Sequence, residues 1–115
     1  MKKIRTKTSS PEKVRKRCEK EAQRRCSSFE WLPVEDLAVY TPDSDTQFLA
    51  VNFHSSDPTI VYIHELAESK FVESVGSDRE EHTVIIPWKA GQFLKCYGSC
   101  QVGEVKLLPS ESTSV

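Results

Sequence analysis

Four cysteines and three histidines are the side chains of this 115-residue chain that could supply nucleophiles, bases or metal ligands. Cys18 and Cys26 are eight residues apart in a predicted helix, about 12 Å along its axis, which is too far for a disulfide or a shared metal. Cys96 and Cys100 flank Tyr97-Gly98-Ser99, so a tight hairpin would place them face to face. For this second pair, idle buried thiols, a hairpin disulfide and a metal site all stay open, although C-x3-C without further ligands is a weak zinc pattern.

Three histidines, His54, His64 and His82, are candidate bases or ligands, and each is weighed against a structural role. His64 lies in Val61-Tyr62-Ile63-His64-Glu65, a predicted strand with no nucleophile placed beside it by a recognisable motif. This favours a strand-face or core histidine. His82 follows the polar residues 77–81, which predicts a solvated loop.

Phosphate-binding and cation-binding loops are also missing from the sequence. Asp43-Ser44-Asp45 resembles the start of a calcium loop, but no glycine or bidentate glutamate follows at the required positions, so we predict a turn. The chain has four glycines and no glycine-rich phosphate loop or specific pair of carboxylates. We therefore expect a protein that is not an enzyme and that has no cofactor and no bound metal.

The charge is divided unevenly along the chain, although the net charge is −1. Residues 1–28 hold eleven Lys or Arg against three Glu, a balance of +8, whereas the remaining residues have a balance of −9. Every aromatic residue lies at Phe29 or later, so the basic segment lacks the bulky side chains that build a core. We predict three parts: a basic arm with an amphipathic helix at 1–33, an acidic antiparallel β-domain at 34–109 and a flexible tail at 110–115.

The helix of the arm has a clear predicted start at Ser10-Pro11-Glu12. The hydroxyl can cap the helix, the proline presets φ, and the carboxylate suits the positive end of the dipole. Residues 1–9 are polar and are expected to be disordered. An apolar residue then recurs every three or four positions as far as Phe29, and Leu32-Pro33 should end the helix.

This arm is the candidate partner-binding site. Its charges offer six to ten possible phosphate contacts to a nucleic acid, but no aromatic side chain lies among them to stack on bases. The same arm could instead lie across an acidic protein surface, or be only a solubilising helix. The predicted contact residues are Lys13, Arg15, Lys16, Arg17, Cys18, Lys20, Ala22, Arg24, Arg25 and Cys26.

Beyond Pro33 the hydrophobic period changes to two, which is typical of strands. We expect a mainly β fold with an N-terminal α-helix, in which about seven short strands form a small antiparallel β-sandwich or barrel. A β-domain of this size buries little apolar surface, so we also expect a homo-oligomer. The predicted strands are residues 37–41, 47–54, 59–66, 71–75, 83–88, 92–97 and 102–108.

The last predicted strands contain the segments Ile86-Pro87-Trp88-Lys89-Ala90-Gly91-Gln92-Phe93-Leu94-Lys95-Cys96-Tyr97-Gly98 and Gly103-Glu104-Val105-Lys106-Leu107-Leu108-Pro109. These segments resemble the closing strands of small β-sandwich domains in bacteriophage fibre and capsid-decoration proteins. Trp88 stands where the family usually has Val, and Ala90-Gly91-Gln92 replaces its Lys-Gly-Asp step. The resemblance implies a structural virion component, commonly trimeric, whose N-terminal segment anchors it to the shell or to a neighbouring subunit.

Two other classes of function compete with the virion component. One is a nucleic-acid-binding protein whose β-domain only makes it oligomeric, and the other is a host-directed phage inhibitor whose acidic face mimics a nucleic acid. The start of the chain leads into a polar helix, and no apolar run approaches the roughly 18 residues of a membrane span. We therefore expect the protein in the virion or in the cytoplasm of the host cell, with no signal peptide and no membrane contact.

Overall fold

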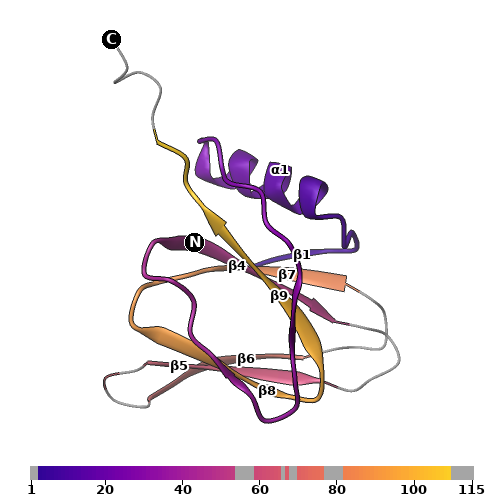
Figure 1. Cartoon of the computed structure of the whole chain (residues 1–115), viewed down its shortest axis with the longest axis vertical. Coiled ribbons are helices and arrows are strands. Elements are labelled where there is room, and N and C mark those ends of the chain that lie inside the picture. The colour runs from indigo at the N-terminus through magenta and orange to yellow at the C-terminus, as the bar shows by residue number, and fades with distance from the viewer. Residues whose placement is uncertain (1–2, 54–58, 66, 68–69, 77–81, 110–115) are drawn as a thin grey trace.

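The structure is a computed structural model that describes residues 3–53, 59–65, 67, 70–76 and 82–109. It is mainly β with one short helix near the N-terminus, as predicted (Figure 1). The elements in chain order are β1 (Ile4–Thr6), α1 (Pro11–Ala22), β2 (Leu32–Val34), β3 (Val39–Tyr40), β4 (Thr46–Phe53), β5 (Ile60–Glu65), β6 (Lys70–Gly76), β7 (His82–Pro87), β8 (Gln92–Tyr97) and β9 (Cys100–Lys106).

The strands form two antiparallel sheets that face each other as a sandwich, and the described strands close no barrel. Strands β1-β7-β4-β9-β2 make a five-stranded sheet, and β3-β8-β5-β6 make a four-stranded one. The pairing is nested along the chain: β2 pairs with β9, β3 with β8, β4 with β7, and β5 with β6. A long hairpin rolled in this way into two sheets is a jelly roll.

The main core lies between the two sheets, where one side of each strand points inward. Alternation along β4 sends Leu49, Val51 and Phe53 into this core, and all three are fully buried. The four-stranded sheet contributes Val61, Ile63, Leu94 and Cys96 from β5 and β8. These contacts hold the sheets face to face through a continuous apolar layer.

A second core lies on the outer face of the five-stranded sheet, under α1 (Figure 1). Phe48 and Ala50 of β4 point to this side and are as buried as their inward neighbours. Val14 and Cys18 of α1 cover them and are themselves fully buried. The predicted separation of an appended arm from the β-domain is therefore not what the structure shows, because both segments share this second core.

The helix starts as predicted but ends about ten residues earlier. Ser10 is the N-cap and accepts a hydrogen bond from the Lys13 amide, whereas Gln23 takes a left-handed conformation after Ala22. The segment that follows is held by the end of β9: the Ser27 amide donates to the Lys106 carbonyl at 2.7 Å, and the Leu108 amide donates to Arg25 at 2.9 Å. These tertiary hydrogen bonds replace the helical ones that the apolar stripe suggested.

Two of the nine described strands were not predicted. Residues 4–6, expected to be disordered, form β1 and pair with Thr83–Ile85 of β7. Leu32-Pro33, expected to end a helix, lies in β2 at an edge of the five-stranded sheet, where a proline needs no partner on its open side. The other seven strands fall within a few residues of their predicted positions. The predicted tail at 110–115 lies outside the described residues.

Candidate functional site

The outward face of α1 is the part of the predicted arm that is available to a partner. Val14 and Cys18 point to the sheet, and the basic residues of the helix lie on the opposite side, at i, i+3, i+4 and i+7 spacing. Their side chains make no hydrogen bond or ion pair with any described residue. This cationic face consists of Lys13, Lys16, Arg17 and Lys20, all exposed.

Arg15 does not belong to the cationic face, although the sequence placed it there. Its guanidinium pairs with Glu12 one turn before it and with Glu19 one turn after it, the latter at 2.9 Å. The hydrogen bond from Arg15 lowers the pKa of the Glu12 carboxyl, and the same contact raises the pKa of Arg15. Arg15 therefore stabilises the helix locally, and its charge is already compensated.

The small apolar residues of the arm are not partner contacts, which corrects the prediction. Cys18 is fully buried and Cys26 is 1% exposed, both in the core between α1 and the five-stranded sheet. Ala22 packs partly against the same cluster. The Cys26 amide donates to Glu19 at 2.8 Å, which folds the chain back beneath the helix. Cys18 and Cys26 also do not share one helix, because α1 ends at Ala22 between them.

Arg24 and Arg25, the last two residues of the predicted site, follow the helix and are exposed. Arg24 donates to the Leu108 carbonyl at 2.8 Å, so its side chain holds the end of β9. They extend the positive potential beyond α1 but are not part of its regular face.

Aromatic contacts fix α1 relative to the sheet. The Phe29 ring lies so close to Gly103 of β9 that a Cβ atom added at this glycine would meet the ring at 2.1 Å. Trp31 meets Phe29 edge to face at 4.9 Å between ring centroids, and its indole nitrogen donates to the Ser9 carbonyl at 2.7 Å. The two ends of the helical segment are thus tied together, so the cationic face is presented on a rigid base.

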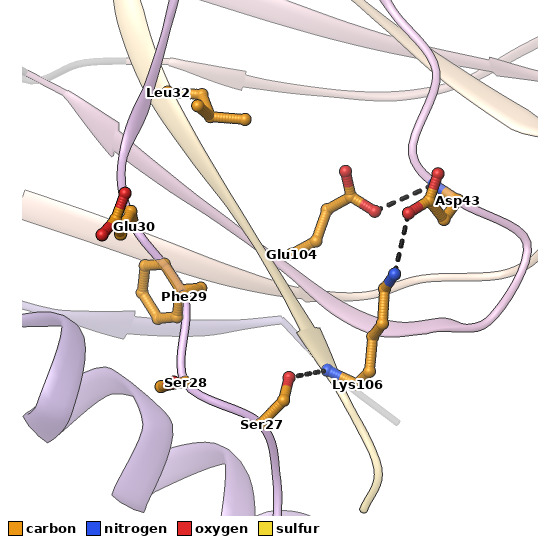
Figure 2. Close-up of a pocket in the computed structure, with 8 residues that line it drawn as sticks. All are labelled: Ser27, Ser28, Phe29, Glu30, Leu32, Asp43, Glu104 and Lys106. Atoms are coloured by element: carbon orange, nitrogen blue, oxygen red, sulfur yellow. Dashed lines mark hydrogen bonds and ion pairs between the residues drawn. The ribbon is translucent and has the colours of Figure 1, made fainter.

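A groove runs beside this segment, between residues 27–32 and the start of β4 (Figure 2). Its volume is about 670 Å³. Glu104 is central, because its carboxylate accepts hydrogen bonds from the Tyr40 hydroxyl, from the Asp43 amide at 2.9 Å and from the Thr46 hydroxyl at 2.6 Å. The lining residues are Ser27, Ser28, Phe29, Glu30, Leu32, Asp43, Glu104 and Lys106.

The charges of this groove satisfy one another. Lys106 Nζ lies 2.7 Å from Asp43 and 3.2 Å from Asp45, and the hydrogen bond to Asp43 is the main cause that raises the pKa of Lys106. Burial, and then the contact with Glu104, raise the pKa of Tyr40. Ser27 accepts a hydrogen bond from the Lys106 amide, which occupies the hydroxyl in a backbone contact. This arrangement fastens the 41–46 turn to β9, and Asp43-Ser44-Asp45 is a turn as predicted.

The second pair of cysteines is buried at the end of the main core. Cys96 of β8 and Cys100 of β9 are both free thiols, with their sulfur atoms 3.6 Å apart. Burial raises the pKa of each thiol above the ordinary value of 9.0. These are the properties of packed core cysteines that also lie within reach of each other.

The two histidines that the structure describes have different surroundings. His64 lies on β5 and stacks on Phe93, with ring centroids 5.1 Å apart, in line with the predicted strand-face position. His82 was predicted in a solvated loop, but it is the first residue of β7, is buried, and stacks on Phe53 at 5.2 Å. Arg5 of the unpredicted β1 lies 3.3 Å from its Nε2. His54 lies outside the described residues.

In the part of the chain that the structure describes, no group of three or more His, Cys, Asp or Glu side chains could hold a metal ion. The helix α1 is too short and too polar to cross a membrane.

The sequence interpretation missed the Glu104 network and the contact between Gly103 and Phe29. The signal that could have suggested Gly103 is an isolated glycine inside a predicted strand, which often marks a close approach. Comparisons with protein-family models, with curated proteins and with solved structures found no match to this chain.

Proposed function

We propose that this chain is a non-catalytic structural protein of a virion-type assembly, anchored to acidic surfaces of neighbouring subunits by the cationic face of α1. The observation that carries the proposal is the geometry of that face. Lys13, Lys16, Arg17 and Lys20 point away from the sheet on a helix whose other side is fully buried. None of the four side chains forms a salt bridge or hydrogen bond with a described residue, and only Lys16 lies near enough to a carboxylate, that of Glu12, to help lower its pKa.

An acidic surface of the right kind exists on the chain itself. Glu30, Glu35 and Asp36 are exposed on the connections on either side of β2, whereas Asp43 and Asp45 are paired with Lys106. The cationic face of one copy can therefore meet the acidic segment 30–36 of the next. Such a head-to-tail contact joins different surfaces and can build rings or larger assemblies.

The jelly-roll topology supports the virion assignment by analogy. This fold occurs in viral capsid domains, but also in lectins and cupins, so it favours no single function by itself. The similarity of residues 86–109 to phage fibre and decoration domains adds to this support. Trimer formation and a place in the virion belong to the same proposal.

The second candidate function is sequence-independent binding of nucleic acid. The spacing of the cationic face favours it, because four cations on one side of a rigid helix can contact successive phosphates. No aromatic side chain lies among them, so base reading is not part of this alternative.

The test compares the full chain with a variant that replaces Lys13, Lys16, Arg17 and Lys20 by Ala. These four side chains are exposed, so the variant should fold normally, which circular dichroism checks. Deleting the arm would not be a valid test, because α1 covers a core. The molar mass of each protein is measured by sedimentation at about 50 mM and about 500 mM salt, with and without random-sequence duplex DNA.

The structural function predicts that the wild type self-associates more strongly at low salt than at high salt and that the variant loses this salt-dependent part, with no retention of DNA. DNA binding that falls steeply with salt and disappears in the variant would instead establish the alternative. A wild type that neither self-associates nor binds DNA at low salt would contradict both.

A further inference from the structure

Along β3, β5 and β8, the outer face of the four-stranded sheet is largely apolar where a solvated sheet face would be polar. The outward positions of β5 are Ile60, Tyr62 and His64, which alternate with the buried Val61 and Ile63. Their register partners on β8 are Tyr97, Lys95 and Phe93. β3 adds Val39, the register partner of Lys95. We call this surface the aromatic face, formed by Val39, Ile60, Tyr62, His64, Phe93, Lys95 and Tyr97.

The rings of the aromatic face are packed against one another across the strands. Tyr62 and Tyr97 meet edge to face with centroids 5.2 Å apart, and His64 stacks on Phe93. A shallow hollow of about 620 Å³ lies among Ile60, Tyr62, His64 and Tyr97. The rings are therefore held in place before any partner arrives, which lowers the entropy cost of covering them.

The exposure of this face is large for apolar residues. Val39 is 58% exposed, Ile60 45% and Tyr97 40%. The helix α1 cannot cover them, because it lies over the other sheet (Figure 1). A contiguous apolar patch on a small domain is a sign of an interface.

The charge on this face indicates what kind of partner it accepts. Its one fully charged residue is Lys95, whose Nζ lies 5.4 Å from the centroid of the Tyr97 ring. No Asp or Glu occupies an outward position of β3, β5 or β8. Single-stranded nucleic acids need a cationic groove beside the stacking rings, which this face lacks. A partner surface should therefore be apolar and nearly uncharged, like the aromatic face itself.

We propose that the aromatic face binds the aromatic face of a second copy of this chain, in a two-fold pair. Two such faces meet without opposing charges, apart from Lys95, and can pack as aligned sheets. This goes beyond the proposed function, because it uses a different surface and a different force. The α1 contact is electrostatic and weakens with salt, whereas the burial of apolar surface persists in high salt.

The size of the face sets the expected strength of the pair. The aromatic face lies on two six-residue strands, β5 and β8, and on the two-residue β3, which at about 4.8 Å between strands and about 3.3 Å per residue project roughly 200 to 250 Å². Stable interfaces bury about 800 Å² per partner, so this pair should be weak and reversible. We expect it to form between about 10 µM and 1 mM chain.

The test is sedimentation equilibrium of the full chain at about 500 mM salt, where contacts through α1 are screened. The wild type is compared with Ile60→Glu and with the matched control Leu32→Glu. Leu32 is also an exposed apolar residue, at 49%, but it lies on β2 of the other sheet. Ile60 and Leu32 are both exposed, so neither change should prevent folding, and circular dichroism checks this.

The proposal expects the wild type and Leu32→Glu to approach twice the chain mass at high concentration. Ile60→Glu should weaken this association at least about tenfold, because it would bury a carboxylate in an apolar contact. A wild type that stays monomeric to about 1 mM overturns the proposal, as does equal association of Ile60→Glu. Single-stranded oligothymidine that binds the wild type but not Ile60→Glu would overturn it in favour of a nucleic-acid platform.

The two sets of variants distinguish a failure of the proposed aromatic-face pair from a failure of the proposed function. Loss of the α1 charges removes only the association at low salt, and Ile60→Glu removes only the association that persists at high salt.

Discussion

The outer faces of the two sheets differ in burial, because the chain covers one of them and leaves the other exposed. On the five-stranded sheet, Phe48, Ala50 and Ile85 point outward and are completely buried, because α1 and the segment after it lie over them. On the four-stranded sheet, Ile60 and Tyr97 also point outward, but they stay largely exposed. An apolar outer face is covered in the first case by the chain's own helix. The apolar outer face of the four-stranded sheet stays open to contact with another molecule.

The cationic face and the exposed apolar face lie over different sheets of the sandwich. The side of the sandwich that α1 covers presents positive charges to solvent, because Lys16 and Arg17 point away from the buried side of the helix. On the uncovered side, the aromatic face on β3, β5 and β8 has one charged residue, Lys95, which lies over Tyr97. The molecule thus presents two unlike surfaces, and contacts through the first should weaken with salt while contacts through the second should persist.

The largest effect should come from placing a charge under the helix. Val14→Asp buries a carboxylate without a partner in the core between α1 and the sheet, and should cost at least about 3 kcal/mol of unfolding free energy. Val39→Asp makes the same chemical change on the uncovered face and should cost less than about 1 kcal/mol. Urea denaturation of dilute protein measures both. Equal costs would show that the two faces do not differ as described.

The next effect tests how the covering segment is held. Gly103→Ala places a methyl group against the Phe29 ring and should cost about 1–3 kcal/mol of unfolding free energy through overpacking. Phe29→Ala alone removes the ring from the second core and should also destabilise the protein. In the double variant the clash is absent, so the two costs should be non-additive by about 1 kcal/mol or more in a double-mutant cycle. Additive costs would mean that the ring moves aside easily.

The covered side should also make stability sensitive to alkaline pH. Burial raises the pKa of the Cys18 thiol to about 12, above the value of 9.0 expected when the chain is unfolded. A raised folded-state pKa contributes stability below pH 9 that is lost as pH rises from 9 towards 12. Between about pH 8 and pH 10 this thiol alone should remove roughly 1 kcal/mol.

Cys18→Ala provides the control for the pH dependence. The variant should be less stable at every pH because of its cavity, but its further loss from about pH 8 to pH 10 should be smaller than that of the wild type by roughly 1 kcal/mol. Urea denaturation at the two pH values gives this difference. Parallel losses in both proteins would assign the alkaline effect to other groups.

The smallest effect should come from the cationic face. Lys16→Ala removes an exposed side chain that forms no salt bridge or hydrogen bond with a described residue, so the free energy of unfolding should change by less than about 0.5 kcal/mol. A larger loss in thermal or urea denaturation would mean that the cationic face contributes to the fold, and would weaken its assignment as a binding surface.

Local patterns predicted much of this structure correctly. The Ser10-Pro11-Glu12 start of α1 depends on capping and on the φ of proline, which are properties of neighbouring residues. Seven strands and the Asp43-Ser44-Asp45 turn follow from the period of two and from turn-forming residues. The basic residues of the candidate site were also recognised, because charged side chains can be read directly from the sequence.

The errors arose where distant residues compete with local preference. The apolar stripe after Ala22 continued the helical pattern, but hydrogen bonds to the end of β9 drew residues 25–27 out of the helix. The polar start of the chain has little tendency to form a strand alone, yet β7 offers it an open edge. We predicted that Cys18 and Cys26 contact a partner. The sequence does not show that the neighbouring sheet also has an apolar outer side, against which both residues pack.

By itself, the sequence determined seven of the nine described strands, the capped start of the helix and the division of charge. Only the tertiary structure decided which sides of the strands face the interior, because β4 and β5 have apolar residues at both odd and even positions. It also decided that the arm covers one sheet and leaves the other uncovered. The physical reason is that charge and period are local properties, whereas burial depends on which surfaces meet.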